Sequence, residues 1–327
     1  MTKTEKRRQD FAHEMIVEIA SLYYSEGLTQ NELSDKFNVS RATIGRILRK
    51  AQEDGVVSIT VQHHPTSVLE LEKKLKKYFN IDRVIVAPFI EDNEMQRQSA
   101  ASLASQYLDN ILQDDMTLAI GAGRNVAQIA TYKFIRRPVN ALFISASGGT
   151  IQANDDNSNA DYICRTFAAK YQARSEALYA PAYVADEKLR EEIKRLNVIM
   201  HTLEKVRHAD IAVIGIGDVS QDSYMVRMGW FEPEEIQQAR KLGTVGDMMG
   251  YDFFDIQGDL VNIPIQGRVI GLSMQELADI PNVIAVAAER NKSVAILGAL
   301  RSGVINTLIT NVENIKEIIH MQEESKV

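Results

Sequence analysis

Apolar side chains in the first 55 residues recur at three- and four-residue spacing, which predicts a run of three short helices. The first is expected over residues 10–25, with Gly27 ending it. Thr29 and Ser40 precede the next two helices and are typical N-caps, and Glu32 completes a capping box with Thr29. The apolar faces are expected to hold Met15, Ile16, Ile19, Leu22, Tyr23, Leu33, Phe37, Ile44, Ile47 and Leu48.

The third helix of this run is basic. Asn38 and Val39 form a short turn before it, and residues 41–50 carry several cationic side chains and no acidic one. Two short helices joined in this way favour a helix-turn-helix that enters the major groove of operator DNA; the alternative is an ordinary helical hairpin. Base edges are assigned to Ser40, Arg41, Thr43 and Arg46, and phosphates to Thr29, Arg49 and Lys50, with Gln30 also among the predicted DNA-binding residues.

The segment after the third helix predicts a wing and a linker. Residues 56–62 are β-branched and partly alternating, which indicates a strand and favours a winged variant, although only one wing strand is clear. His63 and His64 precede Pro65 with no third metal ligand nearby, so we interpret them as linker residues and expect no metal. Residues 66–79 form a charged amphipathic helix, either a dimerising seam or a helix docked on the next domain.

From residue 83 the pattern changes to short apolar strands that alternate with helices. This alternation predicts one large α/β domain with a parallel sheet covered on both faces. The expected strands are 83–87, 117–121, 140–146, 210–215, 282–287 and 305–309. The expected helices are 94–112, 124–135, 158–171, 186–207, 232–241, 273–279, 291–302 and 312–322.

Glycine-rich segments follow several of these strands. Parallel sheets bind ligands at the carboxyl ends of their strands, where glycine lets backbone amides approach an anion and helix N-termini favour negative charge. Together with Arg124 and Lys292, the segments predict an anion-binding pocket, most economically a phosphate site. They are Gly121–Asn125, Ser147–Thr150, Gly215–Asp218 and Gly243–Asp247.

Two nucleotide-binding interpretations are disfavoured. A dinucleotide fingerprint that starts at Gly121 would place Val126 at its sixth position, and the next strand ends in residues 145–147 without an acid for a ribose. No Gly-Lys-Ser or Gly-Lys-Thr follows a glycine-rich turn, so the sequence has no Walker loop. We therefore expect no cofactor.

Charge and composition refine this interpretation. The net charge is −7, but residues 1–79 hold 13 basic and 11 acidic side chains, whereas residues 80–327 hold 24 and 33. Phosphate neutralisation is local, so an acidic body does not exclude DNA binding. The single cysteine, Cys164, excludes an intrachain disulfide. The sequence has no apolar run of roughly 20 residues and no secretory signal, which indicates a cytoplasmic protein without a membrane partner.

The order of these motifs resembles the SorC family of bacterial transcription regulators over nearly the whole chain. The matching segments are Tyr23–Gln30, Ala119–Arg124, Ser147–Gly149, Ala209–Gly217, Gly243–Asp255, Arg268–Leu272 and Lys292 with Ala295 and Ile296. The resemblance implies a Rossmann-like effector domain similar to sugar-phosphate isomerases and deaminases. It also implies that a sugar or sugar phosphate controls operator binding, with the chain acting as a homo-oligomer, a dimer or tetramer.

The resemblance assigns roles to particular residues. Gly121, Gly123, Arg124 and Asn125 would cradle a phosphate, with Lys292 as the counter-charge. Ser147, Gly148 and Gly149 would line the sugar, and Asp247 would accept hydrogen bonds from its hydroxyls. The predicted organisation is a winged helix-turn-helix over residues 1–63, a linker helix over 64–80 and an effector and oligomerisation domain over 81–327.

This chain also departs from the family pattern. Ala288 and Glu289 replace a usual Gly-Gly, so Glu289 would place negative charge near a phosphate and the effector would be bound differently or be less anionic. Asn311 replaces a usual Asp. Ser147 occupies the position where some relatives carry a lysine able to form a Schiff base, so we predict non-covalent binding.

An enzyme is the alternative. A sugar-phosphate isomerase or deaminase needs a base beside the first two sugar carbons, and here no histidine follows Gly217. Asp218, Asp222 and Asp247 remain possible bases, but an enzyme has no need of the N-terminal motif, so we expect a regulator without catalytic residues. Effector binding is expected to order residues 216–231 and to change subunit packing.

Overall fold

The computed structural model describes residues 13–24, 26–57, 65–132, 138–149, 159–221, 223–249, 252–263 and 265–325. The chain divides into two compact units, residues 1–63 and 64–327. Within the described residues, no helix is long and apolar enough to cross a membrane.

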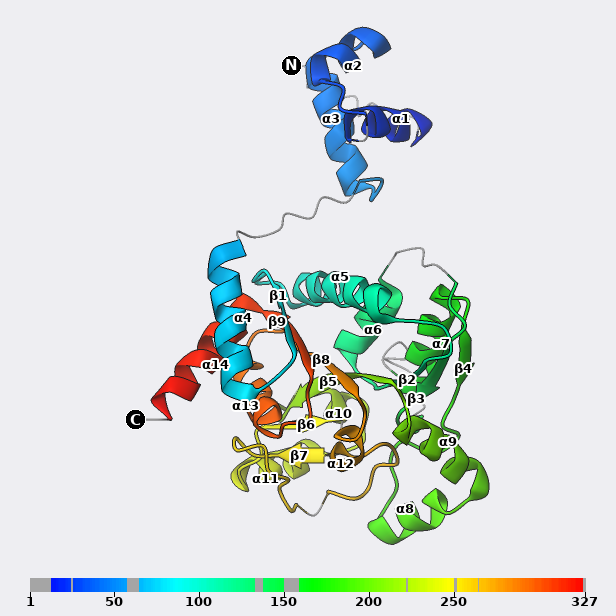
Figure 1. Ribbon diagram of the computed structural model, residues 1–327, viewed down its shortest axis with the longest axis vertical. Coiled ribbons are helices and arrows are strands. Elements are labelled where there is room, and N and C mark those ends of the chain that lie inside the picture. The colour runs from blue at the N-terminus through cyan, green and yellow to red at the C-terminus, as the bar shows by residue number, and fades with distance from the viewer. Residues whose placement is uncertain are drawn as a thin grey trace, which may run out of the picture. The chain divides into compact units, whose positions relative to one another are not determined.

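The N-terminal unit consists of α1 (His13–Tyr24), α2 (Gln30–Phe37) and α3 (Arg41–Glu53) (Figure 1). Both predicted caps are confirmed: the Thr29 side chain accepts a hydrogen bond from the Glu32 amide, and Ser40 accepts one from the Thr43 amide. Asn38 turns the chain between the helices in the left-handed conformation, with a φ of 50°. The buried core is Ile16, Ile19, Ala20, Leu22, Leu33, Ile44, Ile47, Leu48 and Ala51. Most of the expected wing strand, from residue 58 onward, lies outside the described residues.

The large unit is built on a parallel sheet with strand order β1-β9-β8-β5-β2-β3-β4. Its strands are short and rich in branched apolar residues, which suits strands that are buried on both faces. Two further strands, β6 and β7, extend the carboxyl end of β5 as an antiparallel ribbon. The strands are β1 Arg83–Ala87, β2 Thr117–Ile120, β3 Leu142–Ser145, β4 Arg174–Glu176, β5 Ile211–Asp218, β6 Gly246–Met248, β7 Asp252–Phe254, β8 Asn282–Val286 and β9 Thr307–Asn311.

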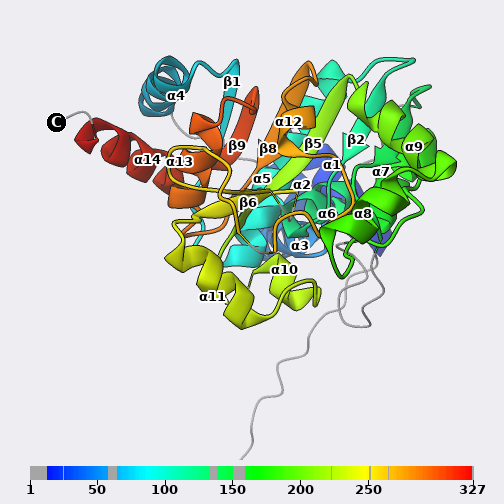
Figure 2. The ribbon, with the colours of Figure 1, turned by 90° about the horizontal axis from the view of Figure 1, so that it is seen from below.

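Helices cover both faces of this sheet and form two apolar layers. One layer packs α5, α6 and α7 on the sheet, and the other packs α4, α9, α13 and α14 (Figures 1 and 2). The helices are α4 Pro65–Phe79, α5 Asn93–Ile111, α6 Arg124–Thr131, α7 Ala160–Lys170, α8 Glu187–Lys194, α9 Asn197–Arg207, α10 Tyr224–Arg227, α11 Pro233–Lys241, α12 Met274–Leu277, α13 Ser293–Arg301 and α14 Val312–Glu324.

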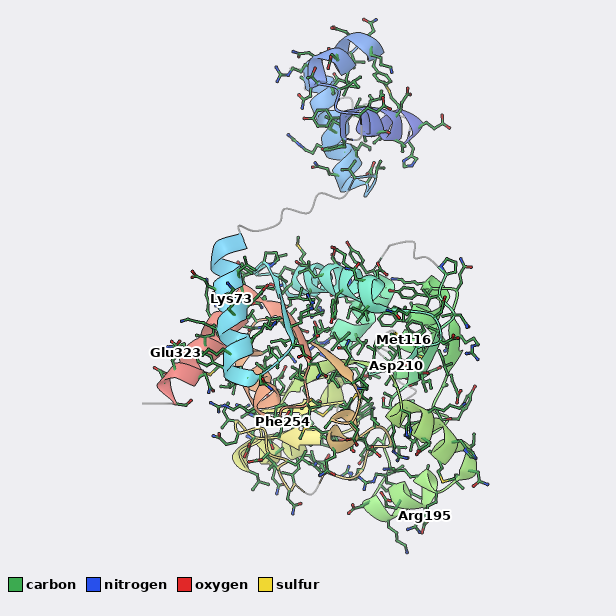
Figure 3. All side chains as sticks on the ribbon, viewed as in Figure 1. Lys73, Met116, Arg195, Asp210, Phe254 and Glu323 are labelled. Carbon is green, nitrogen blue, oxygen red and sulfur yellow. The ribbon has the colours of Figure 1, made fainter. Side chains whose placement is uncertain are left out.

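Helix α4 docks on the body of the large unit, which is one of the two interpretations of residues 66–79. Leu75 is fully buried in the core, and the Tyr78 hydroxyl donates a hydrogen bond of 2.8 Å to Glu323 on α14. The side-chain view shows Lys73 and Glu323 on these neighbouring helices (Figure 3). Helix α4 therefore packs as part of the large unit.

The six predicted strands are confirmed, but two details of the prediction are wrong. The segment expected as one helix over 186–207 is two helices, because Leu196 adopts an extended conformation between α8 and α9 with a ψ of 130°. The short elements β4, β6, β7 and α10 were not predicted. Each has only three or four residues, which is too short for periodicity to identify.

Candidate functional site

The carboxyl ends of β2, β5 and β8 converge on a pocket at one edge of the sheet. The pocket has a volume of about 40 Å³ and shares Arg124, Glu289 and Lys292 with an adjoining cleft of about 560 Å³. Five predicted effector residues line the pocket, namely Gly123, Arg124, Asn125, Asp247 and Lys292. The remaining lining residues of the pocket are Ala122, Gly215, Ile216, Gly217, Tyr224, Met249 and Glu289.

Asp247 reaches this pocket through the antiparallel ribbon. It lies on β6 directly opposite Gly217 of β5, and it is only 3% exposed. A Cβ atom at Gly217 would lie 1.8 Å from Oδ1 of Asp247, so only glycine leaves room for this carboxylate. At Gly121 a Cβ atom would lie 3.2 Å from the carbonyl oxygen of Val213. Gly121 therefore allows close packing of the strand end rather than lining the pocket.

Two helices begin at the pocket without a side-chain cap. Gly123 is the N-cap of α6, with a φ of 111°, and Lys292 is the N-cap of α13; neither makes a side-chain capping hydrogen bond. The first amides of a helix lack partners within the helix and carry a partial positive charge. The two helix starts therefore favour an anion at this edge of the sheet.

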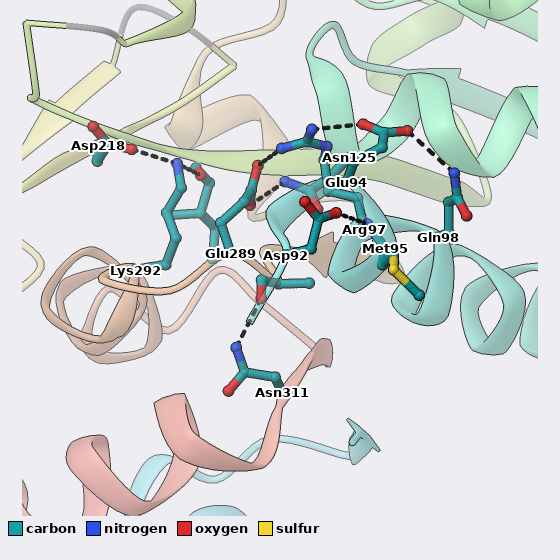
Figure 4. Close-up of polar contacts among 12 residues, drawn as sticks. Asp92, Glu94, Met95, Arg97, Gln98, Asn125, Asp218, Glu289, Lys292 and Asn311 are labelled. Atoms are coloured by element: carbon teal, nitrogen blue, oxygen red, sulfur yellow. Dashed lines mark hydrogen bonds and ion pairs between the residues drawn. The ribbon is translucent and has the colours of Figure 1, made fainter. Parts of the chain in front are cut away.

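An ion pair neutralises Lys292 inside the pocket. Its ammonium group lies 2.8 Å from the Asp218 carboxylate and donates to the carbonyl oxygen of Ile216 at 3.0 Å (Figure 4). Burial alone would raise the pKa of Asp218, but Lys292 and hydrogen bonds from Ser220 outweigh that effect and hold it at about 2. With so low a pKa, and with its carboxylate paired with Lys292, Asp218 is a weak base and is disfavoured as a general base.

Glu289 is held by a second set of contacts. Asn125 donates to one of its oxygens at 2.7 Å, and Arg97 donates to the other at 3.3 Å and to Glu94 at 2.6 Å (Figure 4). Burial would raise the pKa of Glu289, yet the nearby Lys292 and the Asn125 hydrogen bond lower it overall. The negative charge that the sequence places near a phosphate is therefore bound to protein groups.

Positive charge remains in excess around the pocket and cleft. Of the lining side chains, five are cationic and three are carboxylates, although the large unit as a whole is acidic. Among the described residues, Arg124, Arg240 and Arg290 have no hydrogen-bond or ion-pair partner for their guanidinium groups, so they can receive a ligand. The five cations are Arg97, Arg124, Arg240, Arg290 and Lys292, and the three carboxylates are Asp218, Asp247 and Glu289.

The structure does not place Ser147, Gly148 and Gly149 in this lining. The Gly148 amide donates to Ile270, and Gly149 lines a separate hollow that also contains Trp230. A Cβ atom at Gly148 would lie 2.4 Å from the carbonyl oxygen of Pro181, which gives this glycine a packing role. Residues 150–158, which follow, and Asp222 lie outside the described part of the chain.

Sequence reasoning missed several residues of the site. Arg97, Tyr224, Arg240 and Arg290 lie on segments without a glycine motif. Asp218 ends the predicted segment Gly215–Asp218, but its ion pair with Lys292 was not predicted. Tertiary packing brings these residues to the cleft, so the local sequence gave no signal that they belong to the site. Within the described residues, no group of three or more histidine, cysteine, aspartate or glutamate side chains could hold a metal ion.

In the N-terminal unit, α3 exposes Arg41, Arg46 and Arg49. Thr43 is only 9% exposed. Its hydroxyl is hydrogen-bonded to the Ser40 hydroxyl and accepts a hydrogen bond from Arg46, so Thr43 can position the Arg46 side chain. The arginine side chains of α3 therefore form its accessible cationic surface.

A helix-turn-helix unit joined to an α/β unit with a cleft lined by cationic side chains defines a class of protein, the ligand-responsive DNA-binding transcriptional regulators. Comparison with known families gives the same result: residues 20–58 match a winged helix-turn-helix DNA-binding family, and residues 63–320 match the Sugar-bind family, described as a sugar-binding domain. The chain belongs to the SorC family and is a sugar-responsive DNA-binding transcriptional regulator.

Individual relatives support this assignment. The transcriptional regulator LsrR of Escherichia coli K12 is 30% identical over 312 residues, which cover 94% of each chain. A crystal structure of a sugar-binding domain of a transcriptional repressor from Vibrio fischeri is 43% identical, with a TM-score of 0.73, over 78% of this chain and 99% of that one. Full-length SorC from Klebsiella pneumoniae shares the fold, with a TM-score of 0.71 at 24% identity over 94% of this chain and 98% of that one.

Proposed function

We propose that this chain controls a carbohydrate-utilisation operon in the cytoplasm by binding its operator through α3, and that a phosphorylated sugar acts as the effector. The excess of cations around the cleft, in an otherwise acidic unit, carries the proposal. Two uncapped helix starts at the same place supply further amide donors for an anion. A neutral sugar would leave Arg124, Arg240 and Arg290 without an anionic partner.

The effector contacts follow from the lining. Gly123, Arg124 and Asn125 at the start of α6 would hold the phosphate together with Lys292, and Asp247 would accept hydrogen bonds from sugar hydroxyls. Gly121 and residues 147–149 would shape the strand ends. These assignments follow from the placement of the residues and are our proposal for how the cleft is used.

For the operator, we assign base contacts to Arg41 and Arg46, with Ser40 and Thr43 ordering the helix start that presents them. Phosphate contacts are assigned to Thr29, Gln30, Arg49 and Lys50. One helix-turn-helix buries little surface, so we propose at least a dimer on a two-fold operator, and a homotetramer as the resemblance implies.

We propose no enzymatic turnover. The carboxylate of Asp218 is committed to Lys292, and Glu289 is committed to Asn125 and Arg97. The third acid, Asp247, lines the pocket, and no histidine among its described lining residues could assist it as a base. Arg97 and Asn125 are better explained as parts of a binding site.

Thermal unfolding against a panel of sugar phosphates, beside their unphosphorylated parents, tests the effector proposal. A ligand that binds only the folded chain raises the midpoint, by mass action. We expect a shift with one phosphorylated compound that is lost in Lys292→Gln. Lys316→Gln, which removes a lysine from an exposed ion pair with Glu313, is the matched control and should keep the shift.

Other outcomes would count against the proposal. A shift with an unphosphorylated sugar alone would refute the phosphate assignment. An equal shift in Lys292→Gln would remove Lys292 from the site. Operator binding is tested separately, by selecting duplexes from a random pool with wild type and with Arg41→Ala; unchanged selection by Arg41→Ala would refute its base contact.

A further inference from the structure

The anion that pairs with Lys292 in this structure is a carboxylate of the protein itself, that of Asp218. The Lys292 side chain is only 7% exposed, and its ammonium group contacts the Asp218 carboxylate at 2.8 Å and the Ile216 carbonyl at 3.0 Å. A buried ammonium group without a counter-ion is strongly disfavoured. Lys292 can therefore bind an external anion only by exchanging it for Asp218 or by adding it to an existing pair.

The inner pocket is too small for an addition. Its volume is about 40 Å³, whereas ligand pockets are typically roughly 300 Å³ or more. Tyr224 of α10, Met249 and Lys292 line it, whereas Asp218 lines the adjoining cleft. A sugar phosphate that enters the inner pocket from the adjoining cleft must therefore displace part of this lining.

Asp218, which lines the adjoining cleft beside Lys292, is the residue best placed to transmit such a displacement. It is the last residue of β5, and its carboxylate also accepts a hydrogen bond of 2.9 Å from the Ser220 amide in the turn that leads toward α10. Tyr224 on α10 contacts Trp230 edge to face, with ring centroids 5.6 Å apart. The ion pair thus connects Lys292, through Asp218, to the turn at Ser220. That turn leads toward α10, whose Tyr224 lines the pocket.

We propose that Asp218 is an internal counter-ion that the effector's anionic group replaces on Lys292, and that its release frees the turn at Ser220 and the wall formed by α10. This inference rests on the proposed function and adds a determinant of specificity. A neutral sugar cannot replace Asp218, because Lys292 would then be left buried without a counter-ion. Asp218 therefore sets both the requirement for an anionic effector and the affinity with which it binds.

The exchange takes place between two anions at neutral pH. Because the pKa of Asp218 is about 2, protonation does not release it under these conditions. The interaction with Lys292 is local, so a carboxylate elsewhere at the cleft should not substitute for it. Glu94 provides this comparison, since it pairs with Arg97 at 2.6 Å and does not line the pocket.

The test uses the full chain, inorganic phosphate as the probe, and the fluorescence of Trp230, the single tryptophan. We expect Asp218→Asn to bind phosphate at least about tenfold more tightly than wild type, equivalent to about 1.4 kcal/mol. We also expect the emission of ligand-free Asp218→Asn to resemble that of phosphate-bound wild type. Glu94→Gln, the matched removal of one carboxylate, should stay within about twofold of wild type, because the Glu94 carboxylate is exposed and Arg97 keeps its ion pair with Glu289.

Three results would overturn the inference. If Asp218→Asn gains no more affinity than Glu94→Gln, the effect is general electrostatics. If it binds phosphate more weakly, Asp218 holds Lys292 in place for the effector. If neither wild type nor Asp218→Asn binds phosphate, the proposed anion site itself fails. Asp218→Ser, with thermal midpoints measured without phosphate, separates loss of folding from loss of binding.

Discussion

At the residue scale, the pocket depends on which carboxylates are held and by what. Asp218 and Glu289 are tied to cations or amides, so their charge is neutralised within the protein. Asp247 instead depends on a glycine on the opposite strand that leaves space for it. The geometry of the site thus depends partly on Gly217 having no side chain, and a substitution at Gly217 tests this.

Gly217→Ala should abolish the effector-induced thermal shift and lower the free energy of unfolding by about 1–3 kcal/mol, as overpacking does. The added Cβ atom would overlap Oδ1 of Asp247 and displace that carboxylate. Gly215→Ala is the control for stability, because its Cβ atom would meet only the carbonyl oxygen of Ala122 at 3.8 Å. Equal effector shifts in Gly217→Ala and wild type would exclude Asp247 from the effector contacts.

Asp252 gives a pH-dependent prediction. Burial raises its pKa to about 6 from an ordinary value of 3.8, although its carboxylate accepts the Met274 amide. The folded chain therefore keeps a proton that the unfolded chain loses, and stability falls as pH rises between these values. In Asp252→Asn this fall should be smaller, so that stability relative to wild type rises by up to about 3 kcal/mol between pH 4 and pH 7.

Urea unfolding at a series of pH values measures this slope. Asp259→Asn, a substitution of an exposed carboxylate on the segment that follows β7, should follow the wild-type profile. Parallel profiles for wild type and Asp252→Asn would show that Asp252 does not carry the effect.

At the element scale, the sequence predicts best where the cause is local. The caps at Thr29 and Ser40 and the buried stripe of α3 follow from spacing alone, and the structure confirms them. The β6 strand could not be predicted, because three residues form it only by pairing with the end of β5. The break at Leu196 carries neither glycine nor proline, so local sequence offered no signal for it.

The same distinction applies to the site. Its glycine-rich helix start and Lys292 were predictable because strand ends and helix starts have recognisable sequences. Arg97 and Arg240 could not be found this way, since they lie on charged helices whose cleft-facing positions depend on packing. Whether the negative charge of Glu289 remains available in the cleft also depends on Arg97, which is far away in the sequence.

The Ser40 cap at the start of α3 should contribute to the stability of the N-terminal unit. Ser40→Ala should lower the stability of the N-terminal unit by about 1 kcal/mol, because the Thr43 amide loses its capping oxygen. Arg41→Ala, one residue later, removes an exposed side chain and should leave stability within about 0.5 kcal/mol while weakening DNA binding. Chemical unfolding and DNA titration of both variants separate the two roles; equal stability losses would refute this separation.

At the scale of the whole molecule, the boundary between the two units determines which part of the chain should fold and bind the effector by itself. The division falls before α4, and α4 contributes the fully buried Leu75 to the core of the large unit. Full burial of a leucine side chain is worth about 1.5–3 kcal/mol. Helix α4 therefore stabilises the effector unit, even though the sequence pattern describes it as a linker.

A chain of residues 64–327 should fold, bind the effector with the affinity of the full chain and fail to bind operator DNA. A chain of residues 81–327 should unfold at a lower temperature, because it loses Leu75 and the hydrogen bond between Tyr78 and Glu323. Thermal unfolding of both, with and without the effector, measures the contribution of α4. Equal midpoints would show that α4 is dispensable. Loss of effector binding by the 64–327 chain alone would show that the N-terminal unit takes part in effector binding, and the cleft described above would then be incomplete.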